Sequence, residues 1–281
     1  MEQQLEAIRD QQKETWNKFS PGWKKWDEFT MDFLKPMGDQ IITMIRPKDG
    51  EQILDVAAGT GEPGLTIAFM IPNGRVVITD LAEGMLEVAH ENAAQRGIKN
   101  IETAACDVSE MPFADNSFDA ISCRMGFMFF PDMLMAAKEM LRVLKPGGRI
   151  AASYWWMPEK NPWITIMMGT INKNMQLPPP QPGTPGMFRC AKEGMISNLF
   201  SKAGFKNISE KEVTGKLNCK TADKFWGFHT EVAAPVVAAL SKADNEMRAK
   251  IKNEVYDLLD QKFPEGNVAP AFSAMMIYAE K

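Results

Sequence analysis

A short apolar segment followed at once by a glycine-rich loop sets the strongest limit on how this chain can fold. Residues 52–57 are typical of a buried strand, and the loop 58–64 contains Gly59, Gly61 and Gly64. Glycine permits a tight turn and a close approach of the backbone to a ligand. The first N–H groups of a following helix attract negative groups. The segment therefore predicts a strand–loop–helix unit that binds a cofactor.

The next hundred residues repeat this alternation of strands and helices. Further apolar segments typical of buried strands lie at 75–79, 101–105, 118–122 and 149–154. Helical spacing of apolar residues occurs between them, at 65–70, 82–95 and 132–144, and 145–148 ends the last of these helices. Serial β–α–β units imply right-handed crossovers and a mostly parallel sheet. The predicted fold class is therefore α/β and doubly wound.

The two ends of the chain depart from this alternation. Three helices are predicted at 5–19, 23–34 and 38–45, with a break at Ser20-Pro21-Gly22. Later helices are predicted at 161–174, 191–203, 221–240 and 244–263, and strands at 205–213 and 271–279. We therefore expect an N-terminal helical cap at 1–46 and a cofactor-binding core at 47–154. Residues 155–281 would complete the sheet and carry cap insertions at about 155–190 and 219–266.

Composition excludes several classes of protein. The net charge is -4, and no Lys/Arg run supplies the basic stripe that nucleic-acid binding needs. The four cysteines form no C-x-x-C pair and only two histidines occur, so no metal site is expected. Residues 1–18 lack the apolar core of a signal peptide, and the longest apolar stretch, 232–240, is too short to span a membrane. These features predict a cytoplasmic protein that acts on a small molecule; they do not indicate an oligomeric state.

Acidic residues lie at the end of, or just after, three of the predicted strands. Asp80 lies about 20 residues after the glycine loop, where dinucleotide sites place a carboxylate that accepts the ribose hydroxyls. The glycine spacing alone leaves a nicotinamide cofactor open. Asp55 and Glu62, however, would repel a diphosphate, and Asp55 would suit a ligand with an ammonium group. Asp107 is placed to accept a hydrogen bond from an adenine amino group.

Five stretches in order resemble one family. They are Leu54–Gly61, Asp80–Leu86, Asp107, Met111–Asp119 and Leu141–Arg149. The chain resembles the class I S-adenosylmethionine-dependent methyltransferases, within them the UbiE-like (ubiquinone/menaquinone-biosynthesis-type) group. The resemblance implies a Rossmann-like seven-stranded sheet with an antiparallel last strand, and S-adenosyl-L-methionine bound at the carboxyl ends of the first strands.

The same resemblance, with the residues around its motifs, indicates which side chains bind the cofactor. Gly59 and Gly61 would face the methionine part, Asp80 the ribose, and Leu81 and Asp107 the adenine. The full set of predicted cofactor-binding residues is Asp55, Ala57, Gly59, Thr60, Gly61, Asp80, Leu81, Met85, Cys106, Asp107, Val108 and Cys123.

The substrate side is indicated only by its apolar character. Residues 122–131 lack the Asn/Asp-Pro-Pro-aromatic motif of enzymes that methylate adenine amino groups, and the run 125–130 is more apolar than in the quinone enzymes. Aromatic residues are frequent in the predicted cap, which suits a small apolar or aromatic acceptor. The predicted substrate-binding residues are Trp16, Trp23, Arg124, Met125, Phe127, Tyr154 and Trp155.

The sulfonium methyl group is already activated, so the protein has mainly to align it with the acceptor and exclude water. If the acceptor is protonated, His229 is the predicted proton acceptor and catalytic residue. The acceptor atom, oxygen, carbon, nitrogen or sulfur, is not indicated. Two alternatives remain at this point. One is a nicotinamide-dependent oxidoreductase on a similar fold, and the other is a protein that binds S-adenosylmethionine without turnover or for another reaction.

Overall fold

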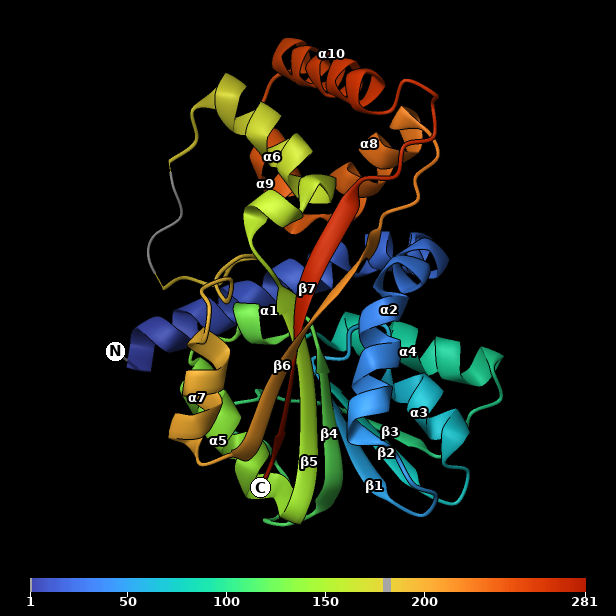
Figure 1. Ribbon diagram of the computed structural model, residues 1–281, viewed down its shortest axis with the longest axis vertical. Coiled ribbons are helices and arrows are strands. Elements are labelled where there is room, and N and C mark those ends of the chain that lie inside the picture. The colour runs from blue at the N-terminus through green and yellow to red at the C-terminus, as the bar shows by residue number, and fades with distance from the viewer. Residues whose placement is uncertain (1, 179–182) are drawn as a thin grey trace.

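The computed structural model describes residues 2–178 and 183–281 and is organised around a seven-stranded sheet (Figure 1). The strands are β1 (Gln52–Val56), β2 (Arg75–Asp80), β3 (Ile101–Ala105), β4 (Phe118–Arg124), β5 (Leu144–Trp155), β6 (Lys206–Lys216) and β7 (Ala271–Glu280). Their order is β3-β2-β1-β4-β5-β7-β6, and β7 runs in the opposite direction to the other six strands, antiparallel to β5 and β6. The predicted doubly wound, mostly parallel seven-stranded sheet is confirmed.

Helices cover both faces of this sheet, which explains why its central strands are continuously apolar. In Figure 1, α2 (Asp27–Ile45), α3 (Gly64–Met70) and α4 (Glu83–Gln95) lie on one side of the sheet. On the other side lie α5 (Met133–Val143) and α7 (Met195–Ala203). Ile53, Leu54 and Ile121 are fully buried between the two layers. A strand that is covered on both faces loses the apolar–polar alternation of a half-exposed strand.

Two long helices, and not three, form the N-terminal part. α1 spans Glu2–Lys25 and passes through Pro21, so the predicted break at residues 20–22 is wrong. Pro21 has no N–H for the carbonyl of Asn17, but the Ser20 hydroxyl donates a hydrogen bond to that carbonyl at 3.0 Å. A side chain at Gly22 would lie 2.4 Å from the Glu231 carbonyl oxygen, so glycine allows the close packing of α1. Pro36 likewise lies inside α2, where the sequence predicts an interruption.

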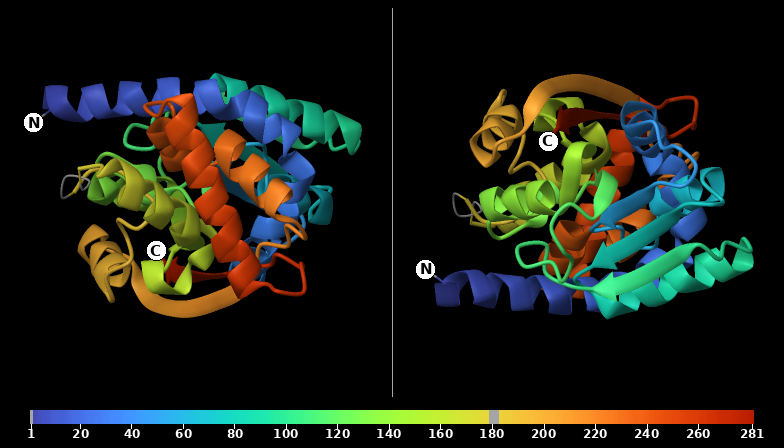
Figure 2. Two further views of the ribbon diagram at one scale, coloured as in Figure 1. Left: turned by 90° about the horizontal axis from the view of Figure 1, so that it is seen from above. Right: turned by 90° about the horizontal axis from the view of Figure 1, so that it is seen from below.

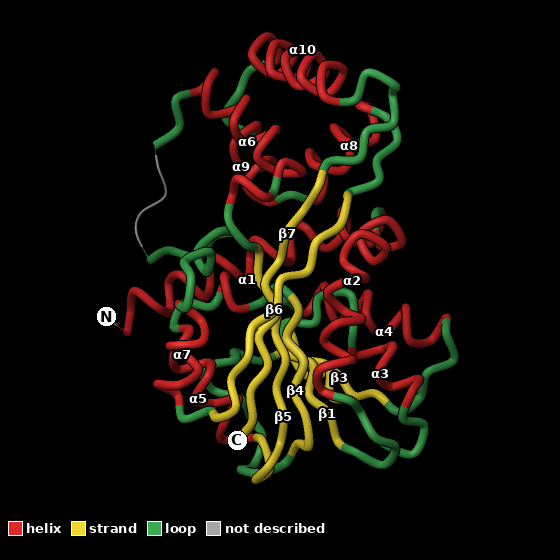
Figure 3. Tube along the Cα trace, in the orientation of Figure 1, coloured by secondary structure: helices red, strands yellow, loops and turns green. Residues whose placement is uncertain are grey.

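Four helices, which we call the cap helices, gather beyond the carboxyl ends of the parallel strands (Figures 1 and 3). They are α6 (Pro162–Met175), α8 (Ala222–Val232), α9 (Ala234–Leu240) and α10 (Asn245–Lys262). The single helix predicted over 221–240 is divided at Ala233, whose backbone is extended, because Pro235 has no N–H for the Glu231 carbonyl and its ring would clash with that carbonyl in a continuous helix. Figure 2 shows α1 running along one flank of the molecule beside α4. The short helices η1 (Phe127–Phe129) and η2 (Pro158–Lys160) complete the connections.

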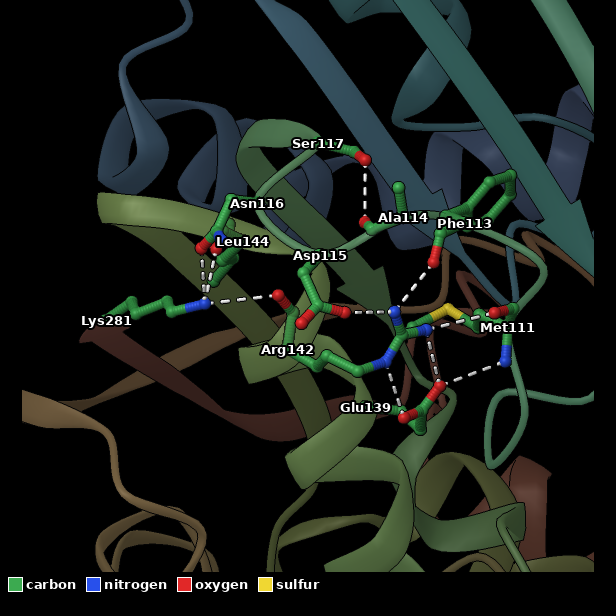
Figure 4. Close-up of polar contacts among 10 residues, drawn as sticks. All are labelled: Met111, Phe113, Ala114, Asp115, Asn116, Ser117, Glu139, Arg142, Leu144 and Lys281. Carbon is green, nitrogen blue, oxygen red and sulfur yellow. Dashed lines mark hydrogen bonds and ion pairs between the residues drawn. The ribbon is translucent and has the colours of Figure 1, made fainter.

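The stretches 111–119 and 141–149, which carry much of the family resemblance, have a structural role at the opposite end of the sheet. Figure 4 shows the Arg142 guanidinium donating to the Glu139 and Asp115 carboxylates and to the carbonyl oxygens of Met111 and Phe113, at 2.7–3.0 Å. α5 ends at Val143, one residue before the predicted end, and residues 144–148 join β5 and are not a separate turn. This network fixes the loop before β4 and leaves the carboxyl ends of the strands free for a ligand.

Candidate functional site

A cavity of about 190 Å³ lies between the carboxyl ends of β1, β2 and β4 and the cap helices. Loops after the strands form its floor, α1 and α2 form one wall, and the junction of α8 and α9 closes it above. In open α/β sheets, ligands bind outside the carboxyl ends of the strands, at the point where the strand order reverses. Here the order reverses between β1 and β4, so the cavity occupies that position.

The glycine loop after β1 is bound to the end of β2 through Asp80. Ala57, Gly59 and Gly61 adopt left-handed conformations, with φ of 52°, 57° and 111°. One Asp80 oxygen accepts a hydrogen bond from the Gly59 N–H at 3.0 Å, and the other accepts from the Ala82 N–H at 3.0 Å. Burial raises the pKa of Asp80, while these backbone donors lower it. Each oxygen retains a lone pair, so the carboxylate can also accept two ligand hydroxyls.

Asp55 does not reach the cavity, contrary to the prediction that it binds the ligand. Its side chain is fully buried within the sheet, where it accepts hydrogen bonds from the Gly64 N–H (2.8 Å) and the Ser122 hydroxyl (2.6 Å). Burial raises the pKa of Asp55 to about 7. Its role is therefore to join β1, β4 and the start of α3. Glu62, the other acidic residue of the loop, forms an ion pair with Arg96.

The structure brings eight of the predicted cofactor-binding residues to the cavity wall. They are Ala57, Gly59, Asp80, Leu81, Met85, Cys106, Asp107 and Val108. The other four, Asp55, Thr60, Gly61 and Cys123, lie behind that wall. Thr60 and Gly61 shape the loop: the Thr60 carbonyl accepts from Asn92, and a side chain at Gly61 would meet Leu65 at 2.8 Å. Cys123 packs under Gly126 and is fully buried.

One face of α1 covers the end of the cavity that holds Asp80 and Asp107, and the sequence prediction missed most of it. Arg9, Gln12 and Trp16, spaced by about one helical turn, line this end. The Arg9 guanidinium lies 3.7 Å from an Asp107 carboxylate oxygen. The helical spacing in the sequence shows the apolar side of α1, but it does not show which neighbour that side covers.

Polar contacts attach α1 to the beginning of α4. The Lys13 ammonium lies 2.5 Å from the Glu83 carboxylate, and the Asn17 side-chain oxygen accepts from the Gly84 N–H at 2.9 Å. We call these contacts the α1 latch. Lys13 and Glu83 are both substantially exposed. Exposed ion pairs contribute little stability, so the latch can open at low cost.

Aromatic side chains form the other end of the cavity. Phe33, Trp155, Trp163 and Phe228 line it, with ring centroids 5.0 Å apart for Phe33 and Trp163 and 4.8 Å apart for Trp155 and Trp163. Of the predicted substrate-binding residues, Trp16, Trp23, Arg124, Met125 and Trp155 line the cavity. The sequence prediction did not include Thr30, Phe33 and Leu34 of α2, although their spacing marks one helix face.

Phe127 and Tyr154 do not line the cavity, so their predicted contact with substrate is wrong. Phe127 is buried against Phe130 and Phe200, with ring centroids 5.2 and 5.3 Å away. The Tyr154 hydroxyl donates to a Glu210 oxygen at 2.7 Å, and burial raises the Tyr154 pKa further from neutrality. Successive residues of a strand point to opposite faces, so Trp155 and Tyr154 cannot both face the cavity.

His229 is a buried histidine and is not placed to act as the predicted general base. It is fully buried, it does not line the cavity, and its ring lies 4.1 Å from that of Phe225. Its Nδ1 lies 2.7 Å from the Phe225 carbonyl oxygen, so Nδ1 carries the proton, and Nε2 has no partner among the described residues. Burial lowers the pKa of His229 to about 4, so the ring is neutral at pH 7.

The charged groups of the cavity are separated along its length. The titratable residues that line it are Arg9, Asp80, Cys106, Asp107 and Arg124. Burial raises the pKa of the Cys106 thiol to about 11, which keeps it protonated near neutral pH. Among the described residues, the aromatic end therefore presents no histidine, carboxylate or thiolate that would act as a general base.

No group of three or more His, Cys, Asp or Glu side chains in residues 2–178 and 183–281 is arranged to hold a metal ion. Within the same ranges, no helix combines the length and hydropathy that a membrane crossing requires.

Comparisons with known sequences agree with the resemblance seen in the motifs. A family model described as the ubiE/COQ5 methyltransferase family matches residues 24–159. The demethylmenaquinone methyltransferase of Staphylococcus aureus (strain JH9) is 41% identical over 184 residues, which cover 60% of this chain and 73% of that protein. The demethylmenaquinone methyltransferase of Listeria monocytogenes serotype 4a (strain HCC23) is 34% identical over 128 residues, 45% of this chain and 54% of that protein. The chain thus spans about half the length of this Listeria relative.

The fold also agrees with solved structures. The YcgJ protein from Bacillus subtilis superposes with a TM-score of 0.59 at 21% sequence identity, covering 87% of this chain and 97% of that one. At this identity the likeness supports the architecture only. The family match begins after Trp23, so the face of α1 that covers the cavity lies outside the matched residues.

Asp80→Asn should weaken the binding of S-adenosylhomocysteine by about 1.5–3 kcal/mol, because it removes a charged acceptor from the ribose hydroxyls. Isothermal titration calorimetry measures the effect. The matched control is Asp119→Asn, at the other end of the sheet, where the carboxylate accepts from the Gln52 N–H and Lys145. Affinity lost equally in both variants, or in neither, would contradict a specific role of Asp80.

His229→Phe should change the pH dependence of stability. Because the folded pKa is about 4 and the unfolded pKa about 6.5, the unfolded state binds more protons between these values. The His229 contribution is therefore lost as the pH falls from about 6.5 towards 4, by on the order of 3 kcal/mol. Denaturant unfolding of wild type, His229→Phe and the exposed control His90→Gln over this range tests it. Parallel curves for all three would show that His229 is not buried and neutral.

Proposed function

We propose, from the premise that this chain belongs to the ubiE/COQ5 methyltransferase family, that it transfers the methyl group of S-adenosylmethionine to a small apolar or aromatic molecule. One observation carries this proposal. The cavity joins a polar end, with Asp80 and Asp107 beside the glycine loop, to an end walled by Phe33, Trp155 and other aromatic rings. The first end suits the adenosine part of the cofactor, and the second suits an apolar acceptor.

The residues present fit this cofactor. The Asp80 carboxylate, held by Gly59 and Ala82, is ready to accept the ribose hydroxyls. Asp107 follows β3 on the same wall, within reach of an adenine amino group, and Leu81 and Val108 supply apolar contacts to the ring. When bound, S-adenosylmethionine supplies a methyl group on a positively charged sulfur, which is the leaving group of the reaction.

At the aromatic end of the cavity, the chain positions the acceptor and excludes water. Aromatic rings there can orient a flat acceptor against the methyl group, and alignment alone can lower a barrier by roughly 7–11 kcal/mol in the best cases. Since His229 lies outside the cavity, it is not placed to take a proton from the acceptor, so the acceptor would react as a neutral nucleophile or after losing its proton to water. The relatives are named for demethylmenaquinone, and an apolar ring system of that kind suits this wall. The acceptor atom stays open.

The predicted division into a core at 47–154 and a cap built from 1–46 and parts of 155–281 is also proposed. It is supported by the position of α1 and the cap helices around the cavity mouth and by the α1 latch. Cofactor exchange would require α1 to move, and its return would shield the sulfonium from water.

A reducing cytoplasmic location is proposed from the four free cysteines of the described chain.

Two measurements distinguish the proposed methyltransferase activity from the two alternatives. S-adenosylhomocysteine should raise the melting temperature by mass action, whereas NADH should not. The protein should then transfer a labelled methyl group from S-adenosylmethionine to at least one acceptor in a panel of phenols, quinols, thiols and amines. The product is measured as label that an organic solvent extracts. A melting temperature raised by NADH only would favour the oxidoreductase. Binding without transfer to any member of the panel would favour a non-catalytic protein.

If the α1 latch helps to retain the cofactor, removing one of its contacts should speed cofactor release. Glu83→Gln should accelerate release of S-adenosylhomocysteine and weaken its binding by about two- to fivefold, because an exposed pair contributes little. Hydrogen exchange should also increase in α1. The matched control is Glu91→Gln, which removes the Lys24–Glu91 pair (2.6 Å) between the same two helices away from the cavity. An equal effect of both variants would mean that α1 is only a structural support.

A further inference from the structure

Trp163, at the start of α6, has the polar edge of its ring held behind the wall of the cavity. The indole Nε1–H donates a hydrogen bond to the side-chain oxygen of Asn161 at 3.1 Å. Asn161 is fully buried and does not line the cavity, whereas Trp163 does line it. The N–H therefore points away from the cavity, and the ring contributes carbon atoms to the aromatic end.

The side-chain amide of Asn161 is itself fixed by the backbone around it. Its nitrogen donates to the carbonyl oxygens of Trp156, Met157 and Ser273 at 3.0–3.3 Å. Its oxygen also accepts from the Ser273 N–H at 3.1 Å. These partners lie just after β5 and near the start of β7, and Figure 1 shows α6 starting beside this end of the two strands. One amide therefore ties the indole of Trp163 to both strands.

The indole cannot turn over without a penalty while Asn161 holds it. Its ring centroid lies 4.8 Å from that of Trp155 and 5.0 Å from that of Phe33, and only 4% of Trp163 is exposed. Turning the ring would break the bond to Asn161, and a buried N–H without a partner is costly. If an apolar residue replaced Asn161, the N–H would lose this partner, and an acceptor atom of a bound ligand would become favourable to it.

We infer that Asn161 is a positioning residue that sets specificity: by holding the Trp163 indole, it makes the aromatic end favour an apolar ring over a ring that carries a carbonyl oxygen. This inference rests on the proposed function and narrows it, because the acceptor would present carbon atoms to Trp163. Asn161 and Trp163 both lie outside residues 24–159, which the family model matches. The motifs that identify the family therefore do not specify this contact.

A purely structural role for Asn161 is the competing explanation, and Asn100 supplies the matched control. The Asn100 side-chain nitrogen donates to the carbonyl oxygens of Ala68, Ile71 and Gly74 at 2.9–3.3 Å, between α3 and β2 and away from the cavity. Asn161→Leu and Asn100→Leu should both lower the melting temperature, because each leaves three carbonyl groups without this donor. Only Asn161→Leu should also change which ligand the cavity prefers.

The experiment titrates indane and 1-indanone, which differ by one carbonyl group, into protein saturated with S-adenosylhomocysteine. Calorimetry gives the ratio of the two dissociation constants. Asn161→Leu should shift this ratio toward 1-indanone by roughly 3- to 10-fold, the effect of one neutral hydrogen bond, and should leave the affinity for S-adenosylhomocysteine unchanged. Asn100→Leu should leave the ratio as in wild type.

A double-mutant cycle shows whether the shift passes through the indole N–H. Trp163→Phe removes that N–H, so adding Asn161→Leu to Trp163→Phe should no longer change the ratio of the two dissociation constants. A shift of the same size in the presence and absence of Trp163 would contradict the positioning role.

A spectroscopic measurement on wild type keeps the test decisive if Asn161→Leu does not fold. In nitrogen-15 spectra, the Nε1–H resonance of Trp163 is the one that Trp163→Phe lacks. It should exchange slowly with solvent and respond alike to indane and 1-indanone, because the carbonyl cannot reach it.

The inference is overturned if that resonance responds to 1-indanone only, or if folded Asn161→Leu keeps the wild-type ratio. It is also overturned if Asn100→Leu shifts the ratio equally, or if wild type binds S-adenosylhomocysteine but neither ring compound. Failure of wild type to bind S-adenosylhomocysteine at all would instead overturn the proposed function.

Discussion

The geometry of the whole site depends on the Asp80 carboxylate. It accepts hydrogen bonds from Gly59 in the loop after β1 and from Ala82 before α4, so one side chain fixes both segments. The next residues, Glu83 and Gly84, hold α1 through Lys13 and Asn17. The N-terminal helix is therefore attached to the segment that is held by the same carboxylate that is expected to bind the ribose. Asp55 has the complementary task inside the sheet, joining β1, β4 and α3 where no ligand can reach it.

The cavity has a distribution of charge that suits a single orientation of a long ligand. Carboxylates lie at the end covered by Arg9 and α1, Arg124 lies on the wall beside the glycine loop, and the remaining surface near Trp155 is apolar. An apolar wall excludes water and strengthens the electrostatic contacts that remain. The aromatic end therefore positions the acceptor: among the described residues it presents no base to it, and His229 stays neutral within the aromatic cluster.

Residues that follow parallel strands could be placed from the sequence, because the carboxyl ends of such strands meet at one edge of the sheet. Asp80 and Asp107 are examples. Side-chain direction was less predictable: Trp155 lines the cavity, but its neighbour Tyr154 points away and donates to Glu210. The contribution of Arg9 could not be predicted, since it depends on how α1 packs against α4. His229 was misplaced because a helix that appears amphipathic in sequence can still be covered by other cap helices.

The most direct measurement is a crystal structure of the full chain with S-adenosylhomocysteine bound. We expect ligand density in the cavity at the carboxyl ends of β1 and β2, with the ribose hydroxyls on Asp80 and the adenine between Asp107 and the Arg9 face of α1. The sulfur should then face the aromatic end, near Trp155. Density in another part of the molecule, or an adenine outside the Asp107 wall with Asp80 still bound only to backbone, would contradict it.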